Sequence, residues 1–114
     1  MKKDVKTFID HIMECICLIE KYTKYCTKQK FMHNVQLQDS IIRRIEIIGE
    51  AVKNIPREFK NKYPKIAWKE IAGMRDILTH EYFGIDLELT WETVKKDIPK
   101  LKKQLITIIK EQKF

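Results

Sequence analysis

Apolar residues separated by three or four positions recur along almost the whole chain, and this spacing limits the fold more than any other feature. In the first segment it runs from Val5 through Ile12 and Ile19 to Cys26. Steps of three and four place side chains on one face of an α-helix. The alternation of apolar and polar residues that marks a strand does not occur, nor does any internal repeat. The pattern therefore predicts an all-α protein.

The first two helices follow from this pattern and from the residues at their ends. We expect the first over residues 4–27, with Asp4 as its N-cap. The second is expected over residues 35–54, where Pro56 ends it because the residue before a proline avoids helical geometry. A polar connector follows Pro56.

The third helix is expected over residues 68–80. Asp86 is the expected N-cap of the last helix, and Pro99 predicts a kink near residues 95–99, because proline lacks a backbone N–H. The length of the chain fits one domain, residues 1–114. The fold class predicted is thus an all-α, up-and-down four-helix bundle with a kinked last helix.

Composition narrows the possible functions. The three glycines are too far apart for a glycine-rich phosphate loop, and the three cysteines lack a C-x-x-C pair, so no cofactor and no metal are expected. No run approaches the ~20 apolar residues that span a bilayer. The N-terminus has no signal-peptide pattern, so we expect a cytoplasmic protein without membrane contact. The net charge of +7 favours a polyanionic partner such as RNA, DNA or an acidic protein.

The stretch GMRDILTHEY concentrates the chemistry of the chain, because it places Arg75, His80 and Tyr82 in the pattern R-x4-H-x-Y. Arginine is a permanent planar cation suited to phosphate, and histidine exchanges protons near neutral pH. On an ideal helix Arg75 and His80 would lie about 140° apart. We therefore expect the helix to end near residues 79–82 and let His80 turn. Asp76, one helical turn before His80, is placed to orient the imidazole and raise its pKa.

Several further segments resemble the HepT family, which belongs to the HEPN superfamily. They are IIGEAV at 47–52, IAWKEIAGMRD at 66–76 and HEYFGID at 80–86, with Trp91 and DIPKL at 97–101 continuing the likeness. The resemblance covers nearly the whole chain, and the three motif positions match without departure. It implies a HEPN-like fold.

The same resemblance implies the toxin of a prokaryotic toxin–antitoxin pair. In that family the toxin is a metal-independent endoribonuclease, so Arg75 and His80 are implied to be catalytic. The implied partner is an MntA-type nucleotidyltransferase antitoxin. It silences the toxin by transferring AMP to the motif tyrosine, which is Tyr82 here.

Metal-free RNA cleavage can also be considered from its chemistry. The 2′-OH of the substrate attacks the phosphate, so a base must accept its proton and an acid must protonate the leaving oxygen, while positive charge stabilises the phosphate. One chain offers one motif histidine and one motif arginine, whereas two chains offer two of each. We therefore expect a homodimer whose two motifs face one cleft. Ile42 and Ile47 widen the apolar face of the second helix, which fits contact with another subunit.

Other charged residues are candidates for supporting roles. Arg43 and Arg44 either bind RNA phosphates or decorate a solvated face. Glu46 and Glu50 lie one turn apart, and salt bridges to nearby cations are favoured over metal ligation. Glu50, inside the IGEA segment, is expected to pack behind the motif.

Two alternatives to a nuclease remain open. A non-catalytic HEPN domain would present nucleotide or substrate to a nucleotidyltransferase through the same Arg75 and His80, and it would not be toxic alone. A purely structural dimer would carry the motif as a vestige. Without the resemblance, an arginine near a histidine on an exposed helix would be read first as solvated surface.

Overall fold

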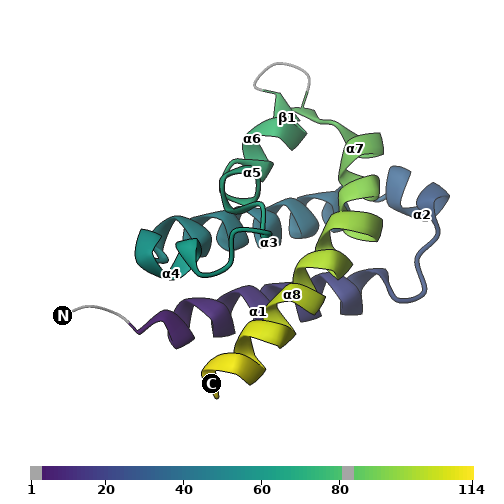
Figure 1. The fold of residues 1–114 in the computed structure, drawn as a ribbon. Coiled ribbons are helices and arrows are strands. Elements are labelled where there is room, and N and C mark those ends of the chain that lie inside the picture. Colours follow the sequence, from purple (N-terminus) through teal and green to yellow (C-terminus); the bar gives the residue numbers. More distant parts are fainter. Residues whose placement is uncertain (1–3, 81–83) are drawn as a thin grey trace.

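The computed structural model describes residues 4–80 and 84–114, except for the side chain of His80. Its two longest helices, α1 (Val5–Thr23) and α3 (Val35–Asn54), lie side by side and run in opposite directions (Figure 1). Each has one apolar face turned towards the other. The predicted all-α fold is confirmed.

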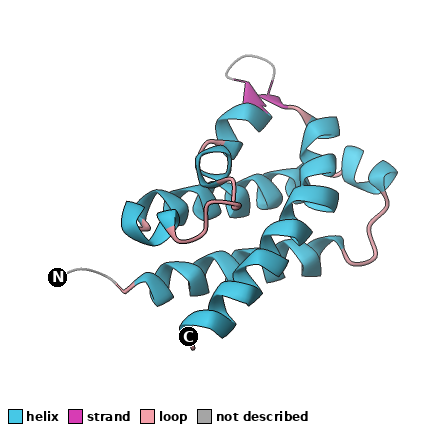
Figure 2. Cartoon of the chain, viewed as in Figure 1, coloured by secondary structure: helices cyan, strands magenta, loops and turns pink. Residues whose placement is uncertain are grey.

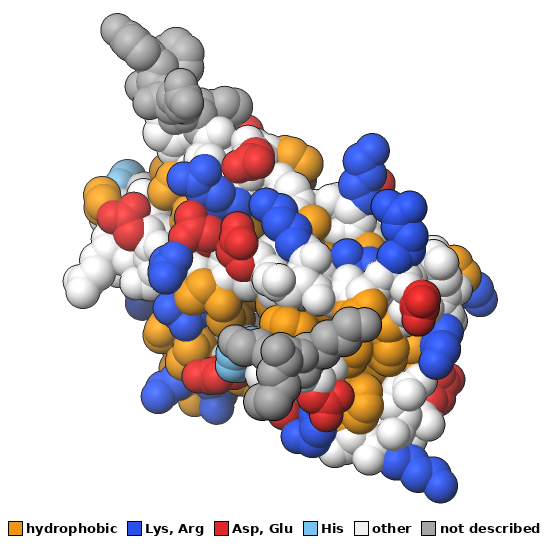
Figure 3. All heavy atoms as spheres, turned by 90° about the vertical axis from the view of Figure 1, so that its left-hand side faces the viewer, with side chains coloured by type: hydrophobic (Ala, Val, Ile, Leu, Met, Phe, Trp, Pro, Cys, Tyr) orange, Lys and Arg blue, Asp and Glu red, His pale blue; other side chains and the backbone are white. Residues whose placement is uncertain are grey.

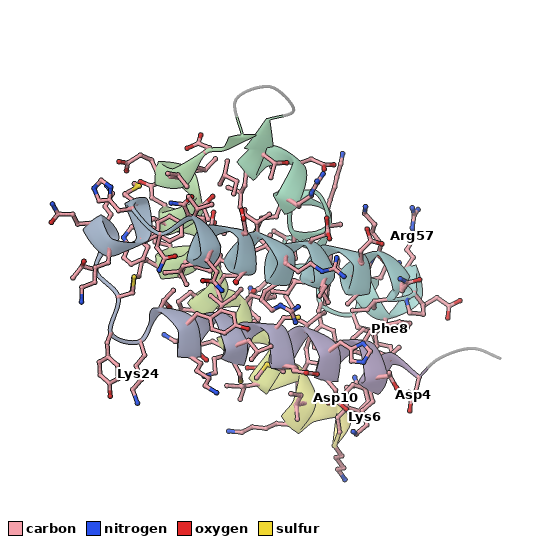
Figure 4. The ribbon with its side chains drawn as sticks, turned by 180° about the vertical axis from the view of Figure 1, so that it is seen from behind. Asp4, Lys6, Phe8, Asp10, Lys24 and Arg57 are labelled. Carbon is pink, nitrogen blue, oxygen red and sulfur yellow. The ribbon has the colours of Figure 1, made fainter. Side chains whose placement is uncertain are left out.

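The first predicted helix is shorter in the structure than the expected range 4–27. Asp4 caps α1 as predicted, and Figure 4 shows it at the start of that helix. The helix ends at Thr23, and a separate short helix, α2 (Lys28–Met32), follows. The hydroxyl of Thr27 accepts a backbone N–H in the first turn of α2. This N-cap begins a new helix where the apolar spacing alone suggested continuation.

The third predicted helix, over 68–80, is divided, so the prediction of one long helix is wrong. The connector forms α4 (Arg57–Asn61), and two short helices follow, α5 (Trp68–Ala72) and α6 (Met74–Leu78). Between them Gly73 has φ −97° and ψ 5°, which departs from helical values. The chain therefore changes direction immediately before the motif.

A short strand pair follows α6, which corrects the expectation that the chain contains no strands. β1 (Thr79–His80) pairs antiparallel with β2 (Gly84–Ile85), at the end of the molecule away from both termini (Figure 2). The N–H of Asp86 donates to the carbonyl of Leu78 at 2.7 Å and closes the base of this hairpin. Gly84 has φ +81°, a conformation that favours glycine.

The last predicted helix is continuous but changes its hydrogen bonding where the kink was predicted. It consists of α7 (Leu87–Glu92), the π-helical segment η1 (Thr93–Asp97) and α8 (Ile98–Gln112). Asp86 caps it as expected. A π-helical turn next to Pro99 fits the missing N–H of that residue, because the wider turn redistributes the backbone acceptors.

The core lies between α1, α3 and α8, with α5 and α6 covering one side. Trp68 is buried, and its indole N–H donates to the carbonyls of Lys60 and Tyr63 at 3.2 and 3.1 Å. Ala67, directly before Trp68, is exposed. Within residues 4–80 and 84–114, no helix combines the length and apolarity needed to cross a membrane. The largest fully buried side chains on the three long helices are Ile9, Ile12, Ile16, Ile19, Ile41, Ile45, Ile48, Ile98, Leu105 and Ile108.

Candidate functional site

The candidate site lies where α6 crosses α3, and a glycine sets the separation of these elements. A Cβ at Gly49 of α3 would lie 2.9 Å from the carbonyl oxygen of Ala72 and 3.4 Å from that of Ile71. Only glycine therefore allows the end of α5 to approach α3 this closely. Because α6 begins directly after Gly73, this approach places Arg75 beside α3.

The guanidinium of Arg75 is held by a carboxylate from the other helix. Its Nε lies 3.2 Å from Oε2 of Glu46 on α3, and its Nη1 lies 3.4 Å from Oδ1 of Asp76. The second carboxylate oxygen of Glu46 pairs with Nη1 of Arg43, one turn earlier on α3. Arg75 remains 48% exposed, so its guanidinium can still reach a bound anion.

After Arg75 the backbone leaves the helix before it reaches His80, as expected from the separation of these two residues in the motif. The helix ends at Leu78, one residue before the expected range of 79–82, and residues 79 and 80 are extended. The hydroxyl of Thr79 donates to the carbonyl of Arg75 at 2.9 Å, and this contact fixes the end of α6. His80 lies opposite Gly84 in the strand pair.

Two of the predicted site residues cannot be placed in full. The side chain of His80 and all of Tyr82 lie outside the described residues. The orientation of the imidazole by Asp76 therefore stays a prediction. The described partner of Asp76 is Arg75, which it contacts through its Oδ1.

The acidic residue at the site is not the one expected. The side chain of Glu50 is 65% exposed and lies 3.7 Å from Lys53, so it does not pack behind the motif. Glu46, one turn earlier, reaches Arg75 instead, and the expectation that it pairs with nearby cations is confirmed. In the sequence Glu46 is a carboxylate close to basic residues on α3. The same is true of Glu50, so the sequence alone does not indicate which of the two glutamates contacts Arg75.

Arg43 and Arg44 border a polar hollow of about 280 Å³ between α1 and α3. Burial raises the pKa of the nearby Cys15 thiol, and the positive charge of Arg44 acts in the opposite direction. Figure 3 shows that acidic and basic side chains are interspersed on the face it presents, so the net charge of +7 does not form one positive field there. The lining residues of the hollow are Tyr22, Asp39, Ser40, Arg43 and Arg44.

A second, apolar groove of about 240 Å³ separates α5 and α6 from the last helical run. Met74, Leu78 and Leu101 contribute to its lining, and Ile77, which is 56% exposed, borders it. On a helix Arg75 and Ile77 point about 200° apart. The groove and the Arg75 ion pairs therefore occupy different faces of α6.

Metal ligands do not gather in the part of the chain that can be described. Across residues 4–79 and 84–114, no three His, Cys, Asp or Glu side chains lie close enough to hold a metal ion. The three cysteines are free thiols.

Comparison with known proteins identifies a family whose members resemble this chain. The family model described as "Ribonuclease HepT-like" matches residues 12–108. A Caldanaerobacter subterraneus protein described as "Putative RNase" is 46% identical over 97% of this chain and 99% of its own length. A Thermococcus cleftensis protein described as "Probable ribonuclease HepT" is 48% identical over 90% of this chain and 93% of its own. A Methanocaldococcus jannaschii protein described as "Gamma-glutamylcyclotransferase and putative RNase" is 60% identical, and the chain spans half of its length. No solved structure matched.

Proposed function

This chain belongs to the HepT-like ribonuclease family, and we propose that it is a metal-independent endoribonuclease, the toxin of a cytoplasmic toxin–antitoxin pair. The observation that carries this proposal is the position of Arg75. Its guanidinium is held beside α3 by Glu46 and remains accessible, while the helix ends before His80. Phosphodiester cleavage without a metal needs a positive charge held near the phosphate and a group that transfers protons, and Arg75 and the motif residue His80 are the proposed sources of these.

In the proposed reaction the 2′-OH of RNA attacks the adjacent phosphate, and the bond to the 5′-oxygen breaks. His80 acts as the general base or acid, and a second histidine from a partner subunit supplies the complementary proton transfer. Arg75 stabilises the negative charge that develops on the phosphate. The site is therefore proposed to be composite, formed by a homodimer whose two motifs share one cleft.

Binding of RNA is proposed to extend from this cleft along α3. Arg43 and Arg44 lie on that helix and border the polar hollow. Their guanidinium groups can contact phosphates on either side of the cleaved bond, which strengthens binding in a salt-dependent way. The face shown in Figure 3 carries mixed charge, so contacts there are expected to concentrate near the motif.

Regulation is proposed to act on the same site. An MntA-type nucleotidyltransferase antitoxin would transfer AMP from ATP to the phenol oxygen of Tyr82, two residues after His80; the α–β phosphoanhydride bond of ATP breaks, pyrophosphate leaves, and the phenol loses its proton. Each AMP adds a phosphate anion and a bulky nucleoside. The added anion would compete with RNA for Arg75 and close the cleft.

The proposal is tested by inducing the protein alone and following growth and total RNA, beside Arg75→Ala and His80→Ala. We expect growth arrest and RNA cleavage with the parent only, and cleavage by the purified parent in excess EDTA. Arg57→Ala on α4 and His11→Ala on α1 are matched controls, because both residues are exposed and outside the site. These two variants should behave as the parent does.

Two further results decide the finer points of the proposal. Tyr82→Phe should cleave RNA yet resist silencing by the antitoxin; loss of cleavage would make Tyr82 catalytic. A fully active monomer in sedimentation experiments would refute the composite site.

The main proposal has its own negative outcome. If the folded parent, unmodified at Tyr82, leaves growth and RNA unchanged, the chain is instead a non-catalytic binding partner of a nucleotidyltransferase.

A further inference from the structure

Glu46 connects the two arginines nearest the proposed cleft. It lies on α3, and its side chain is 32% exposed, less than that of either arginine. One carboxylate oxygen faces Nε of Arg75 across the contact between α3 and α6, at 3.2 Å. The other pairs with Nη1 of Arg43 within α3. Each oxygen therefore has a different arginine as its partner.

This arrangement limits how the guanidinium of Arg75 can move. The group is planar and carries five N–H donors, and ion pairs with two carboxylates, Glu46 near Nε and Asp76 near Nη1, restrict the plane in which these donors lie. Arg43 in turn holds the carboxylate that fixes Nε. The donors of Arg75 that do not face Glu46 or Asp76 are then presented outward in a restricted orientation.

Stability does not explain such a contact. Ion pairs between partly exposed side chains contribute little to folding, because water screens the charges and ordering the side chains costs entropy. A contact of this kind at a catalytic arginine has another consequence, since transition states are stabilised by charges that are already oriented.

We propose that Glu46 is a positioning residue for Arg75, and that Arg43 acts through Glu46. This inference rests on the proposed function, in which Arg75 stabilises the phosphate during cleavage. Glu46 does not touch RNA. Its carboxylate orients Arg75 so that the guanidinium meets the phosphate at the moment when negative charge develops.

The proposal predicts opposite effects on turnover and on binding. Removing Glu46 leaves both arginines charged, so RNA is still attracted, and the loss of a negative charge near the phosphates strengthens that attraction. The released Arg75 samples many orientations, so the chemical step slows. We expect kcat to fall while KM stays the same or decreases.

The experiment compares Glu46→Ala, Glu46→Gln and Glu46→Asp on an oligoribonucleotide that the parent cleaves. Glu46→Ala should lower kcat by about 10- to 100-fold, the range for loss of precise positioning. Glu46→Asp keeps the charge on a shorter side chain and should recover part of this loss. Glu46→Gln keeps one carbonyl acceptor and should lie between the alanine variant and the parent.

Glu20→Ala is the matched control. Glu20 also joins two helices through an exposed pair, with Nζ of Lys102 at 2.9 Å, but it lies on α1 and faces α8. Its kcat and KM should equal those of the parent. A parental kcat in Glu46→Ala, or an equal loss in Glu20→Ala, would overturn the proposed role of Glu46.

A second readout separates this inference from the proposed function. Nitrogen-15 relaxation of the Nε–H of Arg75, whose signal is assigned by its absence in Arg75→Ala, should show a more ordered group in the parent and in Glu20→Ala than in Glu46→Ala. If the parent does not cleave RNA, the proposed function fails, and this measurement still decides whether Glu46 orders Arg75. An order parameter that is unchanged in Glu46→Ala would refute the inference.

Discussion

Replacing Gly49 with alanine should destabilise the protein, although the same change stabilises most helices. The new Cβ would lie 2.9 Å from the carbonyl oxygen of Ala72 and 3.4 Å from that of Ile71. Both atoms belong to the backbone of α5, so neither can rotate away as a flexible side chain would. The helix α5 must therefore move away from α3.

The size of the effect follows from two opposing contributions. In a helix interior, alanine is favoured over glycine by roughly 0.8–1.0 kcal/mol. Forcing an extra carbon into a packed contact costs about 1–3 kcal/mol. The difference predicts that Gly49→Ala lowers the free energy of unfolding by about 1 kcal/mol, within a range of roughly 0–2 kcal/mol.

The assay is urea unfolding followed by the fluorescence of Trp68 and Trp91. Gly73→Ala is the control, because the atom nearest to a new Cβ there, the carbonyl oxygen of Lys69, is 3.7 Å away. We expect a lower unfolding midpoint for Gly49→Ala at an unchanged m-value and no such loss for Gly73→Ala.

The same variant tests the link between this packing and the site. Because α6 follows α5 directly, moving α5 also separates Arg75 from Glu46, so RNA cleavage should fall together with stability. A Gly49→Ala protein that is more stable than the parent and cleaves RNA equally well would refute the reasoning about the close approach.

Three further predictions concern other parts of the fold. Iodoacetamide should alkylate the exposed Cys17 before Cys15, because burial shields Cys15 and raises its pKa; mass spectrometry showing the reverse order would contradict this. Trp68→Phe should cost about 1–3 kcal/mol of unfolding free energy in urea titrations, because two carbonyls lose their indole donor. The hydrogen bond to Glu20 raises the pKa of Lys102 above its ordinary 10.5, so the pair stabilises the fold below that pH and the contribution disappears as pH rises through the raised pKa. Lys102→Met should accordingly cost less than about 1 kcal/mol at pH 7 and nothing in strongly alkaline solution, and a loss that does not depend on pH would exclude the ion pair as its cause.

Local signals in the sequence predicted the long helices of the fold, but not the short helices and strands between them. The three- and four-residue spacing of apolar residues predicted the long helices, and Asp4 and Asp86 were predicted as caps because their side chains accept backbone N–H groups. The break at Gly73 was not predicted. The apolar spacing from Ile71 to Met74 and Leu78 continues through it without interruption, so periodicity alone cannot reveal it.

The motif R-x4-H-x-Y was visible in the sequence because it depends on residue types and short spacing. The same spacing predicted a helix end near residues 79–82, and the helix ends at Leu78. The partner of Arg75 was not visible. Glu46 and Glu50 are four residues apart, so they point in nearly the same direction, about 40° apart around α3. They differ mainly by one turn, about 6 Å, along the helix axis.

The sequence by itself therefore determined the long helices, the caps at Asp4 and Asp86 and the chemical groups at the motif, since these depend on contacts between residues close together in the chain. The tertiary structure decided which glutamate meets Arg75, because that choice depends on the height at which α6 crosses α3. Gly49 sets this crossing through a contact with Ala72, more than twenty residues away in the chain. Local sequence patterns do not indicate how closely α5 approaches α3 at Gly49. The partner of Arg75, Glu46, is therefore visible only in the folded structure.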